Sequence, residues 1–135
     1  MSERASIGVA IIARDAEATI GECLDSFKDY VQQIVVAVDE SSTDQTDVVA
    51  ADHGATTIVK VKVSDWHECA RHGRILVQDF ARARNESFQY LDPHLDYWLW
   101  LDADDVLDGA EKLAGVCAQI PPEAIGTWFP YDYAR

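Results

Sequence analysis

The chain has 135 residues, of which 48% are hydrophobic, and its formal net charge is −13 at pH 7. That length and apolar content suit one compact domain over residues 1–135, while the charge excludes nucleic acid and anionic membranes as expected partners, because no basic patch can bind phosphate backbones. Three cysteines without a C-x-x-C pair, no signal-peptide pattern and no apolar segment of membrane-spanning length predict a cytoplasmic protein with free thiols.

The chain opens with a predicted strand and helix. The apolar run over residues 7–12 indicates a buried strand. Asp15 is the candidate N-cap of a helix whose apolar positions repeat at helical spacing from Ile20 to Val31.

A second strand and helix follow in the same order. The apolar run over residues 34–38 predicts a strand that ends at Asp39. Residues 42–45 have the pattern of a capping box and predict a helix that Gly54 ends. The alternating residues 57–61 predict a third strand.

The middle of the chain is less regular. Residues 64–73 carry mixed charge without a period and predict a mobile loop, and the spacing of His67, Glu68, Cys69 and His72 matches no common zinc site. A helical pattern is predicted from Arg74 to about Leu91, where Asp92-Pro93 ends it. Arg82 and Arg84 point to different faces of this helix, so at most one faces a pocket.

A last apolar run, Leu99–Leu101, is followed by three carboxylates, Asp102, Asp104 and Asp105. Carboxylates this close repel one another unless a positive charge neutralises them, which suggests a divalent cation and a phosphate-bearing ligand. The alternative is that they only start a helix. We expect Trp98 and Trp100 to pack in the core of a strand buried on both faces.

The alternation of strands and helices predicts an α/β fold: a mostly parallel, doubly wound sheet with helices on both faces. A short helix at about residues 109–119 and a strand at 126–131 would complete it. Asp39 and Asp102 each end a strand, so we expect their carboxyl groups at one sheet edge, facing a common cleft. Taken alone, Asp39 could equally be a helix cap.

Four segments in this order resemble glycosyltransferase family 2, whose members are nucleotide-diphospho-sugar transferases of the GT-A fold. Val9–Glu17 is similar to the family's first strand and loop, and Val38–Thr46 to its V-D-[DT]-G-S-T-D-x-T segment. Phe80–Asn85 resembles F-A-x-A-R-N, and Leu101–Asp105 resembles the metal motif L-D-A-D-[DE]. The resemblance covers almost the whole chain, although Glu40 and Ser41 depart from the Asp and Gly that the family often has.

The resemblance implies metal-dependent transfer of a sugar, with inversion, from a nucleotide-diphospho-sugar, with a UDP-sugar favoured, to a hydroxyl of a saccharide, lipid or protein acceptor. It also implies residue roles. The resemblance assigns recognition of the base, with uracil favoured, to Asp39 and the lining of the nucleotide pocket to Ala13 and Asp15. Arg84 is expected to approach the diphosphate. Asp102 is expected to approach the ribose or the metal, and Asp104 to ligate Mn²⁺ or Mg²⁺.

The family's catalytic base and acceptor-binding segment lie downstream of the metal motif, in a C-terminal part that this chain largely lacks. The base is therefore unknown, and Glu111, Glu123 and Asp132 are candidates by chemistry alone. We expect the chain by itself to bind donor and to transfer poorly. The alternatives are a non-catalytic nucleotide-sugar-binding module and a haloacid-dehalogenase-like phosphatase with Asp102 as the nucleophile, for which little chain remains to supply the further Lys and acids.

Overall fold

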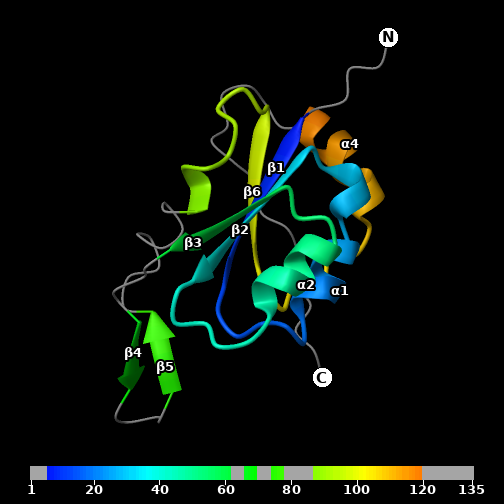
Figure 1. The fold of residues 1–135 in the computed structure, drawn as a ribbon. Coiled ribbons are helices and arrows are strands. Elements are labelled where there is room, and N and C mark those ends of the chain that lie inside the picture. Colours follow the sequence, from blue (N-terminus) through cyan, green and yellow to red (C-terminus); the bar gives the residue numbers. More distant parts are fainter. Residues whose placement is uncertain (1–5, 62–65, 70–73, 78–86, 120–135) are drawn as a thin grey trace.

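A computed structural model of the chain describes residues 6–61, 66–69, 74–77 and 87–119 (Figure 1). Its main sheet has four parallel strands in the order β3-β2-β1-β6, and β4 (Trp66–Cys69) pairs with β5 (Arg74–Val77) in a separate antiparallel sheet. The main strands are β1 (Ile7–Ala13), β2 (Gln33–Asp39), β3 (Thr57–Val61) and β6 (Tyr97–Asp102). The helices are α1 (Ile20–Asp25), η1 (Lys28–Tyr30), α2 (Thr46–Asp52), η2 (Ala110–Lys112) and α4 (Leu113–Ala118).

The two central strands explain why the sheet is parallel and buried. β1 and β2 are almost continuously apolar and almost wholly buried, as expected of strands that are covered on both faces. Each pairs in parallel with two neighbours, so the carboxyl ends of all four strands meet at one edge. The predicted α/β fold with a parallel sheet is confirmed.

Each face of the sheet has its own apolar layer. Ile7, Val9 and Ile11 of β1 belong to the larger cluster, which includes buried residues of α1, α2 and α4; these three helices lie on one side of the sheet (Figure 1). On the other face, Ala10 packs in a cluster with Leu91. Gly8, two residues before Ala10, lets Leu91 and Leu95 approach the backbone of β1 on this face.

That close approach occurs at Gly8. A Cβ atom built there would lie 2.4 Å from Leu95 Cδ1 and 2.8 Å from Leu91 Cδ2, closer than any real contact. The absent side chain therefore makes room for residues 88–95 against the second face. Phe88, which is helical, also packs in this layer.

The middle of the chain departs from the sequence prediction. Within the predicted loop, Trp66–Cys69 forms β4, and the predicted helix start, Arg74–Val77, forms β5. The two strands are paired antiparallel from Trp66↔Val77 to Cys69↔Arg74. Pairing with a nearby strand outweighs the helical spacing of the apolar residues, because Ile75, Leu76 and Val77 also fit a strand. Ser87 and Phe88 are helical, but the helix does not continue to Leu91, where the sequence predicts its end.

The first two helices begin later than predicted. Thr19, not Asp15, is the N-cap of α1, which ends at Asp25 before the separate turn η1. The capping box at residues 42–45 does not form: α2 begins at Thr46 with Gln45 as N-cap and without a side-chain cap from that residue. Both side chains expected to cap a helix instead bond to residues of another loop, as described below.

The end of α2 follows the prediction. Gly54 has φ of 101°, which favours glycine. Its N–H donates to the Ala51 carbonyl at 3.3 Å, and the Ala55 N–H donates to the Ala50 carbonyl at 3.1 Å. This pair of hydrogen bonds is the Schellman motif, so Gly54 terminates the helix as expected.

The expectation that Trp98 and Trp100 lie in the core is wrong. They are 49% and 47% exposed. Phe88 stacks on Trp98 with 5.8 Å between ring centroids and meets Trp100 edge-on at 5.9 Å. The side chains of β6 alternate between half-buried and exposed, so one face of this strand is much less covered than the other, whereas β1 is buried on both faces.

At the carboxyl end of the described chain, η2 and α4 together match the helix predicted at 109–119. The strand predicted at 126–131 lies outside the described residues. None of the helices in the described ranges combines the length and apolar character that a bilayer crossing requires.

Candidate functional site

Asp39 is the last residue of β2 and is buried, with 2% of its surface exposed. The backbone N–H of Ser41 donates to Asp39 Oδ2 at 2.9 Å, and the Ser41 hydroxyl donates to the same oxygen. Burying a carboxylate is costly unless hydrogen bonds compensate it, and Ser41 provides such bonds two residues along the chain. A buried acceptor is thus held at the ligand-binding edge of the sheet.

Asp102 lies at the same edge and on the same face as Asp39. Ile12 of β1 pairs with Ala37 on one side and with Asp102 on the other, so these three residues share a face. Asp39 follows Ala37 by two positions and joins that face. The predicted shared edge is confirmed, and the common cleft stays a prediction.

Asp102, Asp104 and Asp105 form an acidic cluster. One carboxylate oxygen from each lies within 4.8 Å of the others. Asp105 Oδ2 accepts the Asp102 N–H at 3.0 Å, and the Asp105 N–H donates to the Asp102 carbonyl at 3.0 Å, which folds the turn back on the strand end. Three hard oxygen donors at this separation suit a divalent cation such as Mn²⁺ or Mg²⁺. The family resemblance assigns metal binding to Asp104 and Asp102, and the geometry adds Asp105, the third acid of the run, as a candidate ligand.

The negative charge of this cluster reaches a buried thiol. Cys23 Sγ lies 3.6 Å from the Asp102 carbonyl oxygen. Burial, and then the charges of Asp105, Asp104 and Asp102, raise the pKa of Cys23 to about 12. Cys23 and Cys117 are both free thiols, as predicted, and burial also raises the pKa of Cys117.

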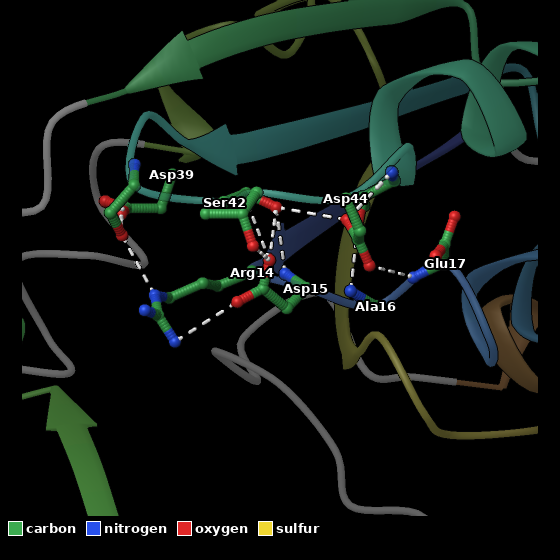
Figure 2. Close-up of polar contacts among 10 residues, drawn as sticks. Arg14, Asp15, Ala16, Glu17, Asp39, Ser42 and Asp44 are labelled. Atoms are coloured by element: carbon green, nitrogen blue, oxygen red, sulfur yellow. Dashed lines mark hydrogen bonds and ion pairs between the residues drawn. The ribbon is translucent and has the colours of Figure 1, made fainter.

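Two loops meet beside Asp39: residues 14–19 between β1 and α1, and residues 40–45 between β2 and α2 (Figure 2). Asp15 Oδ1 accepts the Thr43 N–H at 2.7 Å, and the Asp15 N–H donates to the Ser42 hydroxyl at 2.9 Å. The Thr43 N–H is the main reason that the pKa of Asp15 lies below its usual value. The carboxylate is thus engaged with the second loop.

Asp44 connects the same two loops, and here the accepting carboxylate belongs to the second loop and the donor to the first. Its Oδ2 accepts the Glu17 N–H at 3.0 Å, and its Oδ1 accepts the Thr46 N–H at 3.0 Å. The Ala16 N–H donates to the Thr46 hydroxyl at 2.8 Å. Desolvation raises the pKa of Asp44, but the hydrogen bonds from Thr46 and Glu17 outweigh it and hold this pKa below its usual value.

Arg14 completes this contact and was not foreseen from the sequence. Its Nε donates to the Ser41 hydroxyl at 2.9 Å, the same hydroxyl that donates to Asp39. Its guanidinium also lies 3.5 Å from Asp15 Oδ2. Arg14, Ser41 and Asp39 therefore form a chain of hydrogen bonds from the surface to the buried carboxylate.

The remaining predicted site residues lie as follows. Ala13 ends β1 and is buried in the cluster on the α1 side of the sheet, so its side chain is on the opposite face from Asp39. Only its backbone is therefore available to a ligand at that face. Arg84 lies outside the described residues.

A family model matches almost the whole chain. Residues 8–132 match the family model described as Glycosyl transferase family 2. A TPR repeat-containing protein of Synechococcus elongatus is 32% identical over 103 residues, which are 76% of this chain and 21% of that protein. The chain thus spans about a fifth of the curated relative it matches.

Two solved structures are also similar. S. aureus TarS in complex with UDP has a TM-score of 0.58 at 20% identity, and the match covers 84% of this chain and 31% of that chain. The crystal structure of a mycobacterial protein is 34% identical over a shorter part, with a TM-score of 0.38 and coverage of 43% of this chain and 20% of that chain. The likeness to TarS supports the fold.

Proposed function

Because the chain belongs to glycosyl transferase family 2, we propose that it binds a UDP-sugar with a divalent cation and takes part in transferring the sugar, with inversion, to an acceptor hydroxyl. The observation that carries the proposal is the buried Asp39 carboxylate on the same edge and face as Asp102, the first residue of the acidic cluster. The TarS structure, which contains UDP, supports the choice of nucleotide.

In this proposal each acid has a distinct task. Asp39 accepts the ring N–H of uracil, and its charge strengthens that hydrogen bond. Asp104 and Asp102, with Asp105 beside them, hold Mn²⁺ or Mg²⁺, which when bound neutralises the diphosphate and stabilises it as a leaving group. Arg84 approaches the same diphosphate, and the backbone of Ala13 lines the nucleotide pocket.

Metal dependence follows from charge. A chain with a formal charge of −13 repels a diphosphate unless a cation lies between them. We expect Mn²⁺ to raise the affinity for UDP at least about tenfold over the metal-free protein, which corresponds to about 1.4 kcal/mol. Asp104→Asn should remove most of that increase.

Calorimetric titration with UDP, in EDTA and in Mn²⁺, measures this effect. Asp108→Asn is the matched control, because Asp108 is an exposed acid just beyond the cluster and should keep the full response to Mn²⁺. Equal affinity of the original chain in both solutions would refute metal dependence.

Transfer needs a general base near the acceptor, and the described chain offers no clear one. Glu111, in η2, is exposed, while Glu123 and Asp132 lie outside the described residues. We therefore expect the 135-residue chain to bind donor and to transfer its sugar poorly. Incubation with labelled UDP-sugars and a panel of saccharide acceptors tests this, and efficient transfer would show that the base lies within these residues.

A further inference from the structure

The contact between residues 14–19 and 40–45 has a role that the family resemblance does not assign. Three donors converge on Asp15 Oδ1: the Thr43 N–H at 2.7 Å, the Thr43 hydroxyl at 3.2 Å and the Ser42 hydroxyl at 3.3 Å. A carboxylate oxygen has two lone pairs, so this atom is fully engaged within the protein. The Asp15 N–H adds a fourth contact, to the Ser42 hydroxyl.

The backbone of Asp15 makes this arrangement possible. Its φ is 49°, in the left-handed region that residues with a side chain seldom adopt, and Asp tolerates that region better than most. In this conformation the N–H and the carboxylate of Asp15 both reach the segment Ser42–Thr43. The hydrogen bonds across the two loops offset the conformational cost.

The segment held by Asp15 is continuous with the partners of Asp39. The Ser41 N–H donates to the Asp39 carboxylate, and the Ser42 N–H donates to the Asp39 carbonyl at 2.9 Å. Displacement of Ser42 and Thr43 would therefore move Ser41, and with it the hydrogen bonds that orient the Asp39 carboxylate.

We propose that Asp15 is a positioning residue: it fixes residues 41–43 so that Asp39 is oriented before the nucleotide binds, and it does so as a hydrogen-bond acceptor rather than by touching the nucleotide. The effect on nucleotide affinity rests on the proposed function, whereas the effect on the loop does not. A preset carboxylate lowers the cost of ordering the site on binding.

Two substitutions separate the acceptor from the charge. Asp15→Asn keeps an acceptor oxygen and the tolerance for positive φ, so it should hold the loop. Asp15→Gly keeps the backbone conformation and removes the acceptor. Because glycine also loosens its own loop, Ser42→Ala removes part of the contact from the other side and should act in the same direction. Asp47→Asn is the matched control, because it removes a carboxylate of α2 that is paired with Lys60 of β3 and lies outside this contact.

Amide hydrogen exchange of the free protein tests the loop. Protection of the Thr43 and Ser41 amides should fall together in Asp15→Gly and Ser42→Ala, and should persist in Asp15→Asn and Asp47→Asn. Loss at Thr43 with unchanged protection at Ser41 would overturn the proposal, because the effect would not reach the partner of Asp39.

Titration with UDP in Mn²⁺ tests the consequence for binding. We expect Asp15→Gly to weaken binding about tenfold and Asp15→Asn to stay within about twofold of the original chain, with circular dichroism unchanged in both. If Asp15→Asn binds as weakly as Asp15→Gly, the charge acts directly on the ligand and the proposal is wrong. Failure of the original chain to bind UDP would instead refute the proposed function, and the exchange experiment would still decide the role of Asp15.

Discussion

The carboxylate of Asp39 is buried, and its burial needs compensation by hydrogen bonds. Its carboxylate is almost wholly buried, and the bonds from Ser41 engage one of its two oxygens. Transfer of a carboxylate out of water costs on the order of several kcal/mol before hydrogen bonds compensate it. A residue that served packing alone would be neutral, and the proposed role in base recognition gives a reason for an acid at this position.

Asp39→Asn separates these two roles. The amide keeps an oxygen for the Ser41 N–H and removes a buried charge, so we expect the melting temperature to stay the same or to rise. UDP affinity in Mn²⁺ should fall about tenfold, because hydrogen bonds to a charged acceptor are roughly twice as strong as those to a neutral one. Differential scanning calorimetry and UDP titration measure the pair of effects; unchanged affinity would exclude Asp39 as the base-recognition residue.

At the scale of elements, the glycines of β1 and α4 differ in the space available for a side chain. Gly8 leaves room for Leu91 and Leu95 on the second face of the sheet. Gly115 lies in the exposed part of α4, and a Cβ there would meet no atom within 4 Å. The first glycine is required by packing, and the second only lowers helix propensity.

The same substitution at these two positions should therefore have opposite signs. Gly8→Ala forces Leu91 and Leu95 to move and should lower the free energy of unfolding by about 1–3 kcal/mol. Gly115→Ala should raise it by up to about 1 kcal/mol, because alanine is the better helix former. Urea denaturation of both variants gives the values, and a destabilised Gly115→Ala protein would mean that α4 packs against something on that face.

The sequence predicts most elements of the main sheet because their signals are local. Apolar runs locate β1, β2 and β6, alternation locates β3, and the φ preference of Gly54 locates the end of α2. It misassigns β4 and β5, since short strands depend on pairing as much as on composition. The helix starts differ for a related reason. Asp15 has a typical capping side chain, but it bonds to residues 42–43 instead of α1. Asp44 divides its carboxylate between the Glu17 N–H and the Thr46 N–H at the start of α2.

The candidate site divides in the same way. Asp39 and Asp102 are predictable because each ends an apolar run, and parallel strands bring such ends together. Arg14 and the acceptor role of Asp15 are not, because their partners Ser41 and Thr43 lie 27 and 28 residues further along the chain. Contacts of that kind leave no periodicity or motif in the sequence.

For the whole molecule, the perturbed groups define the pH range of stability. Hydrogen bonds and ion pairs lower the pKa of Asp15, Asp25 and Asp47 below 3.8, and the same holds for Asp44 despite its desolvation. The stability from these groups is present above pH 3.8 and is lost as pH falls through the lower values of the folded state. Cys23 has the opposite sign: its contribution is present below pH 9.0 and is lost as pH rises toward about 12.

We therefore expect the free energy of unfolding to be highest between these limits and to decline on both sides. Urea denaturation at a series of pH values measures it. Cys23→Ala should reduce the decline above pH 9.0, because it removes the thiol whose ionisation disfavours the fold. An alkaline decline of the same slope in Cys23→Ala would assign that limb to other groups.

The strand order also sets the sequence in which the site is assembled during folding. Contacts between the start of β1 and β2 span 25 residues, whereas those between the start of β1 and β6 span 90. Closing the longer loop costs about 1 kcal/mol more in chain entropy. β1, the loop that carries Asp15, and β2, which ends at Asp39, can therefore form before β6 docks, and in a growing chain they leave the ribosome first. On this argument the part of the proposed site around Asp39 forms early in folding, and the acidic cluster is added when β6, the last described strand of the main sheet, docks.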